Sequence, residues 1–489
     1  MTISLNTASS SVKTTLTSVR SIAALGAALS LGACSADQLN ITNPNTPTVA
    51  AAAADPQALQ LQATGLLRQL RGGRGGFMTS TGIFGREAYN YTPQEGRNTS
   101  AYLIGISGQN RLDPAGFATG NWAGQYGNLR DIFNLKNAAT SSTSLSAEQK
   151  SAVQGFAKTL EGLELLYVIS TRDTLGAIVE IKQNASDLAA FVSRDSTYKY
   201  ILATLDDGAA NLAAGGSAFP FTIHAGFNGF NTPSTFRQFN RAIAARAAAY
   251  YATSGGGAAA WQRALTALTA SFLNTTASTR AQLDVGPSHV YSAATGDANN
   301  PLNVVTATDI YAHTSFQTDA QNKASGQPDD RYTTKIGARA TRNAPQGLGI
   351  ASSLGFNIYP ALTSSIPIIR NEELMLLRAE ALLATADKAG AIAVINQIRV
   401  NSGGLAPTAL TASSSDADVL TEILYNKRYS LMLEGHRWID MRRYGRLNQL
   451  PLDITSGVNT HFVARVMPIP QAECLVRAGK PAPIAAPGC

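Results

Sequence analysis

Three charged helical segments near the C-terminal end constrain the fold of this chain more than any other feature. They are residues 370–381, 395–399 and 433–443. Charged side chains recur in them every three or four residues, a spacing that brings side chains together on one face of a helix. Apolar residues such as Leu374 and Leu377 fall on a separate stripe. The pattern predicts packed helices with a charged seam between them.

The connections between these helices predict how they are arranged. A helix over 371–386 is followed by Asp387, which caps a second helix over 388–401. Gly403 and Gly404 end that second helix. A connection of two or three residues makes the two helices antiparallel neighbours. A last helix is predicted from Ser415 or Asp416 to about residue 444, with Gly435 in its interior at a close helix contact.

The last helix carries a ladder of alternating charge at Glu434, Arg437, Asp440 and Arg443. Glu434 and Asp440 could be read as a catalytic acid and base. A general acid needs a raised pKa, and Arg437 between the two carboxylates would lower the pKa of both. We therefore interpret the ladder as a structural set of ion pairs.

The rest of the chain predicts a mainly α fold with few short strands. Helical periodicity recurs in pairs, and the clearest pair is 235–252 and 258–273, joined by a Gly-rich turn. The spacing is too irregular for a strict repeat, but it indicates helix pairs with large irregular loop insertions. Residues 275–369 are rich in Asn, Asp, Pro, Gly and Thr. We expect loops with short strands there, carrying surface function.

Residues 83–117 form an irregular aromatic stretch. Rings beside Arg and amide groups suit sugars, because rings stack on apolar C–H faces and polar groups bind hydroxyls. The alternative is that the rings pack the loop onto the helices beneath. The candidate ligand-binding residues are Arg86, Tyr89, Tyr91, Asn98 and Tyr102.

The N-terminus has the pattern of a bacterial lipoprotein. Lys13 and Arg20 precede an apolar run over 22–31, which is too short to span a bilayer and typical of a signal-peptide core. Leu31-Gly32-Ala33-Cys34 resembles a lipobox, so lipidation of Cys34 is predicted. We expect a signal peptide over 1–33, a tether over 34–50 and a membrane anchor through acyl chains.

The other two cysteines, Cys474 and Cys489, are predicted to form a disulfide in an oxidising compartment. A formal net charge of +7 over 489 residues gives no footprint for nucleic acid. The five His residues are widely scattered and no Gly-x-Ser-x-Gly motif is present. The sequence therefore predicts no metal site, no cofactor and no enzymatic activity.

Five motifs in order carry a resemblance to a known family. They are Trp122-x-x-x-Tyr126, Arg378-Ala379-Glu380-Ala381, Ile395-Asn396-x-x-Arg399, Glu434-Gly435-x-Arg437-x-x-Asp440-x-x-Arg443 and Pro468-Ile469-Pro470-x-x-Glu473. Together with the lipobox they resemble the SusD/RagB family of nutrient-binding outer-membrane lipoproteins. The chain departs from the family pattern at Lys427-Arg428, where Glu-Arg is usual, and at Ser430, where a second Glu is common.

The resemblance implies tetratricopeptide-like helix pairs in a single domain over 51–489, with an N-terminal half over 51–274 and a signature region over 275–489. It implies a surface-exposed protein of the outer membrane that binds a glycan and delivers it to a SusC-like TonB-dependent transporter. A peptide ligand, or a helical-repeat scaffold for other envelope proteins, remains the alternative. Ligand residues of the family lie in variable loops, so none is carried over by motif.

Overall fold

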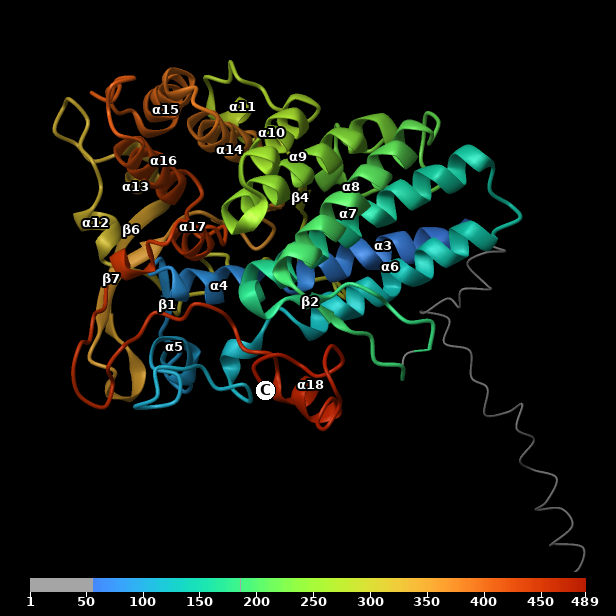
Figure 1. Cartoon of the computed structure of the whole chain (residues 1–489). Helices are drawn as coiled ribbons and strands as arrows, with labels where there is room; N and C mark the ends of the chain where they lie inside the picture. The colour runs from blue at the N-terminus through green and yellow to red at the C-terminus, as the bar shows by residue number, and fades with distance from the viewer. Residues whose placement is uncertain (1–55, 185) are drawn as a thin grey trace, which may run out of the picture. The chain divides into compact units, whose positions relative to one another are not determined.

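A computed structural model describes residues 56–184 and 186–489. The predicted signal peptide, the tether and Cys34 lie outside these residues. Helices dominate the described chain and strands are few and short, which confirms the predicted fold class (Figure 1). The helices of the described residues are each too short or too polar to cross a lipid bilayer.

Helices of the N-terminal half pack in the order in which they follow one another. α6 packs on α7, α7 on α8, α8 on α9 and α9 on α10, with α3 against α6 (Figure 1). Their bounds are α3 Pro56–Gly72, α6 Ala123–Ser141, α7 Ala147–Arg172, α8 Arg194–Ala213, α9 Pro233–Tyr251 and α10 Gly257–Thr269.

Helix α7 lies at the centre of this half, where it contacts α6, α8 and α9. Its N-terminus is capped by a local hydrogen-bond motif, and a glycine allows close packing on α8. Ser146 accepts a hydrogen bond from the backbone N–H of Gln149 and closes a capping box. Gly155 lets α8 approach closely, since a Cβ there would lie 2.5 Å from Leu212 Cγ. Most residues of α7 beyond Ala152 are buried. The cap and the close-contact glycine of α7 are both local features of the sequence.

The region predicted as loops contains short antiparallel strands that tie it to the N-terminal part. A four-stranded sheet runs in the order β1, β5, β7, β6, with bounds β1 Ala88–Asn90, β5 Ile310–Ala312, β7 Ala351–Phe356 and β6 Ile336–Asn343. Two smaller pairs are β2 Ala177–Ile178 with β3 Phe191–Val192, and β4 Ser288–His289 with β8 Ile366–Pro367. Short helices lie between the strands at α11 Arg280–Leu283, α12 Ser315–Thr318 and α13 Asp330–Lys335.

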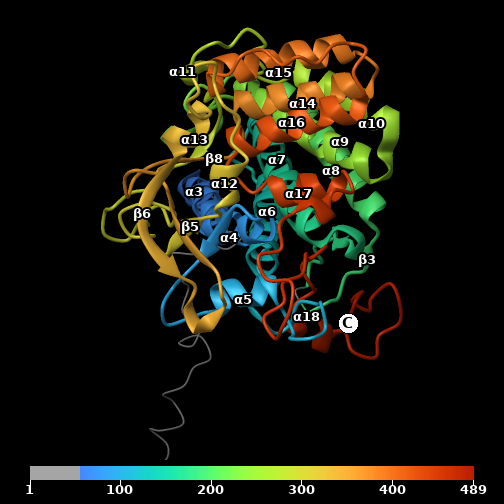
Figure 2. The same cartoon turned by 90° about the vertical axis from the view of Figure 1, so that its left-hand side faces the viewer.

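The charged segments form the helices α14 Asn371–Ala384, α15 Lys388–Gly403, α16 Asp416–Ser430 and α17 Arg437–Arg443 (Figure 2). Asp387 and Ser415 cap α15 and α16 as predicted. The prediction of a single last helix was wrong, because the chain leaves the helical conformation between α16 and α17. Leu433 has φ +57° and Gly435 has φ +90°. Gly435 therefore serves a turn rather than a helix interior.

The remaining elements pack around these helices. α4 Arg74–Phe84 contacts α17, and α5 Arg97–Leu103 lies beside β1. The C-terminal tail contains α18 Gln471–Val476, and a disulfide joins Cys474 to Cys489. This bond closes a loop with a sequence separation of 15 residues.

Candidate functional site

The charges of the C-terminal helices are bound to one another in the interior. Lys427 Nζ lies 2.7 Å from Glu380 Oε1 and 2.9 Å from Asp440 Oδ2. Arg443 donates to both carboxylates, with its Nε 2.8 Å from Asp440 Oδ1. The side chains of all four residues are at most 3% exposed. The charges of this network are thus paired with one another, away from solvent.

A second buried network surrounds Arg370. Its Nη2 lies 2.8 Å from Glu434 Oε1, and its Nη1 donates to Glu372. Burial lowers the pKa of the Arg370 guanidinium, but Glu434 and Glu372 outweigh it and hold the pKa well above its ordinary value. Burial raises the pKa of Glu372, but Arg370, Arg280 and Lys335 bring it well below its ordinary value. Both groups are therefore fixed in their charged forms.

The predicted ladder is split by the break before α17. Asp440 and Arg443 pair, but Glu434 turns to Arg370 instead. Arg437 donates its Nε–H to the backbone carbonyl of Gly85 at 3.2 Å, and it bridges neither carboxylate. The predicted ladder required all four residues to lie on one continuous helix. The turn at Gly435 interrupts that helix.

Three of the candidate ligand residues lie in the interior. Arg86, Tyr89 and Tyr91 are at most 3% exposed. Arg86 donates to the carbonyls of Pro451 and Phe462, and the Tyr89 hydroxyl donates to the Asp453 carboxylate. Tyr91 stacks on Tyr311 of β5 at 5.4 Å between ring centres. These contacts favour the packing alternative for this part of the aromatic stretch.

The other two candidates lie on α5 and are half-buried. Asn98 is partly open to solvent, and the Tyr102 hydroxyl donates to the Phe117 carbonyl at 3.1 Å. Phe117 is 40% exposed, and the Arg97 guanidinium lies 4.8 Å from the centre of its ring. This small patch on α5 retains the chemistry that the sequence suggested, although Tyr102 also packs against the cluster that contains Tyr89 and Tyr91.

A cleft of about 470 Å³ lies between the loop region and the C-terminal helices. Its volume is within the ~300–1,000 Å³ usual for small-molecule sites. Most of its wall comes from residues 275–369, where surface function was expected, and none comes from 83–117. The lining residues are Arg280, Asp284, Gly286, Ser288, Thr334, Lys335, Asn357, Ile358, Tyr359, Ser364, Ser365, Pro367, Arg370 and Glu434.

Several polar side chains of the cleft are free to bind a ligand. Asn357 and Ser365 are exposed, Ser288 is half-buried, and the side chains of these three make no hydrogen bond within the described chain. Arg280 and Asp284 form a two-point ion pair at the rim, at 2.7 and 2.6 Å. Burial lowers the pKa of Lys335 to about 8, and the nearby Arg370 lowers it too. The amine donates to the carbonyls of Tyr429 and Ser430.

Sequence reasoning did not single out these cleft residues, apart from Arg370 and Glu434 of the charged segments. They stand in α11, α13, β4 and the segments around β7 and β8, which the chain brings together from separate stretches. The available signal was compositional, since Asn, Ser, Thr and Asp are dense between 275 and 369. Composition places function in this region but does not say which side chains meet.

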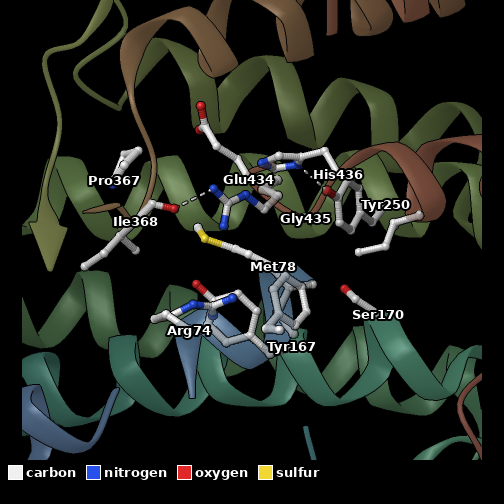
Figure 3. Close-up of a pocket in the computed structure, with 14 residues that line it drawn as sticks. Arg74, Met78, Tyr167, Ser170, Tyr250, Pro367, Ile368, Glu434, Gly435 and His436 are labelled. Carbon is white, nitrogen blue, oxygen red and sulfur yellow. Dashed lines mark hydrogen bonds between the residues drawn. The ribbon is translucent and has the colours of Figure 1, made fainter. Parts of the chain in front are cut away.

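A second hollow, shown in Figure 3, is an internal cavity between α4, α7, α9 and the turn at Gly435. It holds only about 20 Å³, close to the space for one water molecule. Arg74 covers the Tyr167 ring at 3.8 Å, and the Tyr250 hydroxyl lies 3.1 Å from His436 Nδ1. This cavity is too small for a sugar or a peptide.

The part of the chain that the structure describes contains no cluster of three His, Cys, Asp or Glu residues placed as metal ligands. The functional groups of the cleft are hydroxyl, amide, amine, guanidinium and carboxylate groups. Such groups recognise hydroxyls and charges by hydrogen bonds.

Comparisons with known proteins agree with this architecture. A model of the SusD family matches residues 360–467, which contain α14 to α17. SusD-like protein P38 of Formosa agariphila is 34% identical over 124 residues, and this match covers 24% of this chain and 24% of that protein. The chain thus matches about a quarter of the length of this curated relative.

Solved structures match almost over their whole length. The crystal structure of a SusD superfamily protein from Bacteroides vulgatus aligns with a TM-score of 0.62 at 14% identity, covering 86% of this chain and 97% of that one. The match of residues 360–467 to the SusD family, together with the shared fold, confirms the predicted resemblance to the SusD/RagB family. Surface glycan-binding protein A from Bacteroides thetaiotaomicron in complex with laminarihexaose aligns with a TM-score of 0.65 at 11% identity, covering 87% and 98%. At such identities the structural matches speak for the fold alone.

Proposed function

We propose that this chain is a binding protein that captures an oligosaccharide in the cleft of about 470 Å³. The observation that carries the proposal is the cleft itself, which combines unbonded hydroxyl and amide groups with a charged rim. The fold supports it, because a surface glycan-binding protein solved in complex with laminarihexaose shares this architecture over 98% of its length. We infer that this site binds its ligand without catalytic turnover.

The chemistry of the cleft fits a sugar in two ways. Asn357 and Ser365 offer amide and hydroxyl groups, which can donate and accept hydrogen bonds to neighbouring hydroxyls of a sugar. Ile358 and Pro367 supply apolar surface for the C–H face of a ring. Each planar amide or carboxylate can bind two adjacent hydroxyls at once, which fixes the orientation of the ligand.

We further propose that the chain delivers its ligand to a SusC-like TonB-dependent transporter and is held at the outer membrane by lipid on Cys34. The match of residues 360–467 to the SusD family supports this role. Labelling of cells with a radioactive fatty acid tests the anchor. Cys34→Ala should abolish labelling of this protein and release it from the membrane fraction. Labelling that persists in the variant would contradict the anchor.

Affinity electrophoresis of the purified full-length chain tests the binding role. Gels that contain one of a panel of soluble polysaccharides are compared with gels that contain none. The proposal expects retardation by at least one polysaccharide and no release of reducing sugar on prolonged incubation. Unchanged mobility with every glycan of the panel would contradict carbohydrate binding, and measurable hydrolysis would contradict a purely binding role.

A peptide ligand is the second candidate, and the Arg280–Asp284 pair at the rim favours it. A guanidinium and a carboxylate side by side suit the two charged ends of a short peptide. Incubation of the chain with a mixed peptide pool, followed by mass spectrometry of the retained fraction, separates the two candidates. Retention of peptides without retention of any glycan would identify this second function.

A further inference from the structure

A third pocket, separate from the cleft, lies where the ends of α7 and α9 and the start of α8 meet α17. Its volume is about 230 Å³. It shares Tyr250 and Ile439 with the internal cavity and no residue with the cleft. The side chains that matter for its chemistry are Asp173, Arg194, Tyr198, Thr253, Arg442, Arg443 and Arg465.

The wall of this pocket is rich in guanidinium groups. It contains four guanidinium groups and a single carboxylate, that of Asp173. Asp173 is shared, with its Oδ1 at 2.7 Å from Arg194 Nη1 and its Oδ2 at 3.7 Å from Arg442 Nε. Burial lowers the pKa of Arg442. Asp173 and Tyr198 raise it, and the nearby Arg194 and Arg465 lower it again. The guanidinium groups are thus close enough to repel one another.

Two of the arginines keep hydrogen-bond donors unused. The side chain of Arg443 is 3% exposed, and its Nη1 is buried with no hydrogen-bond partner. Arg465 is exposed, and its side chain makes no hydrogen bond or ion pair with any described residue. A buried donor without an acceptor is costly, so its presence at a pocket wall indicates a missing acceptor.

The ends of neighbouring helices explain part of the positive charge. Cations are favoured at the C-terminus of a helix, and Arg442 lies in the last turn of α17. Arg442 also donates to the carbonyls of Ser170 at 2.5 Å and Arg465 at 3.2 Å. This structural role does not extend to Nη1 of Arg443 or to the side chain of Arg465.

We propose that this pocket binds a phosphate group, either as the free ion or as a phosphate monoester. Guanidinium groups present paired donors that match the oxygens of phosphate, and Thr253 and Tyr198 add hydroxyls at the same wall. The volume lies below the ~300 Å³ at which pockets for larger ligands begin, which suits a small anion and excludes an oligosaccharide. The site is independent of the proposed sugar cleft.

Equilibrium dialysis of the full-length chain at low ionic strength tests the proposal, with radiolabelled inorganic phosphate and glycerol 3-phosphate as separate probes. Saturable binding of at least one probe is expected, with one site per chain. Inorganic phosphate alone would identify the free ion, and glycerol 3-phosphate would identify a monoester. Arg465→Ala should weaken binding about tenfold, the loss expected for one charge-assisted hydrogen bond.

Arg237→Ala is the matched control, because Arg237 is exposed on α9 and does not line the pocket. It removes the same charge and should leave binding unchanged. Both substitutions are at exposed positions, so folding is expected to persist and thermal unfolding checks it. Failure of both probes to bind, or equal affinity in wild type and Arg465→Ala, would overturn the proposal. Equal weakening by the two variants would show that only the net charge of the protein matters, and this result would also overturn the proposal.

Discussion

The buried charges of α14 to α17 and the polar groups of the cleft use similar residue types, but the two regions differ in whether their bonds are already made. Lys427 is 2% exposed and is held by Glu380 and Asp440. Asn357 and Ser365 of the cleft are exposed, and their side chains have no partner within the described chain. A satisfied network rigidifies a fold. Unsatisfied groups at a surface are available to a ligand.

This difference reverses what charge density in the sequence suggests. The densest charged pattern of the chain belongs to a scaffold, and the cleft is lined by a stretch without periodicity. Binding residues are often placed on loops that a rigid scaffold holds in position. The following predictions test each side of this division, beginning with the largest effect.

Loss of the central lysine should damage the scaffold most. Lys427→Met leaves Glu380 and Asp440 buried with Arg443 as their remaining cation. Removing one partner of a buried charge network costs about 3–5 kcal/mol of the free energy of unfolding. Urea denaturation at pH 7 measures it. Lys388→Met is the control, since its partner Asp416 is 73% exposed and the loss should be below about 1 kcal/mol. Similar losses in the two variants would contradict the division.

Glu87 is a buried carboxyl group near the scaffold whose charge is not fully compensated by neighbouring cations. Burial raises its pKa to about 7, against the lowering effect of Arg437 and Arg428. The folded form therefore binds the Glu87 proton more tightly than the unfolded form. The contribution of Glu87 to stability falls as the pH rises from about 4.5 to 7.

Glu87→Gln removes this loss. The variant should gain about 3 kcal/mol relative to wild type between pH 4.5 and 8, by the free energy equivalent of the pKa shift. Urea denaturation at several pH values measures the difference. Glu180→Gln, at a side chain that is 60% exposed, is the control. A difference from wild type that stays constant with pH would show that Glu87 is not uncompensated.

The turn between α16 and α17 tests how tightly the scaffold is packed. Gly435→Ala places a Cβ 2.3 Å from Phe77 Cε1 at a φ of +90°. Gly445→Ala also meets a positive φ, of +67°, but with open space around the added atom. The first variant should be less stable than the second by about 1–3 kcal/mol, the usual cost of overpacking. Thermal unfolding compares them, and equal stability would place the turn outside the packed region.

The cleft should tolerate substitution with little effect on folding. Asn357→Ala removes an exposed amide without a side-chain partner, so the free energy of unfolding should change by less than about 0.5 kcal/mol. Urea denaturation measures it beside the Lys427→Met variant. A loss of more than about 1 kcal/mol would show that Asn357 belongs to the scaffold.

Local signals in the sequence predicted the helices well. The caps at Ser146, Asp387 and Ser415 accept the hydrogen bonds that their residue types imply, and Gly404 ends α15 in the left-handed region. Such signals act over a few residues, so the sequence alone contains them. The mainly α architecture and the family resemblance followed from these segments.

The features that the sequence did not predict depend on contacts between residues far apart in the chain. Tyr89 and Tyr91 were candidate ligand residues, with packing onto the helices beneath as the alternative. β1 pairs with β5, opposing Asn90 to Ile310, and both rings are buried. Gly435 has helical spacing, yet its contact with Phe77 of α4 needs a turn. The cleft combines segments from α11 to Glu434 and has no local pattern. Its residues could be placed in a region but not named.

The most direct test of the central claim is the affinity of the chain for the polysaccharide that retards it most, measured by isothermal titration calorimetry. Wild type is compared with two double variants, Asn357→Ala/Ser365→Ala in the cleft and Asn98→Ala/Tyr102→Ala on α5. We predict that the cleft variant binds at least about tenfold more weakly, as expected for the loss of two hydrogen bonds, and that the α5 variant binds like wild type. Unchanged affinity of the cleft variant, with weakened binding by the α5 variant, would contradict the account and return the site to the aromatic stretch.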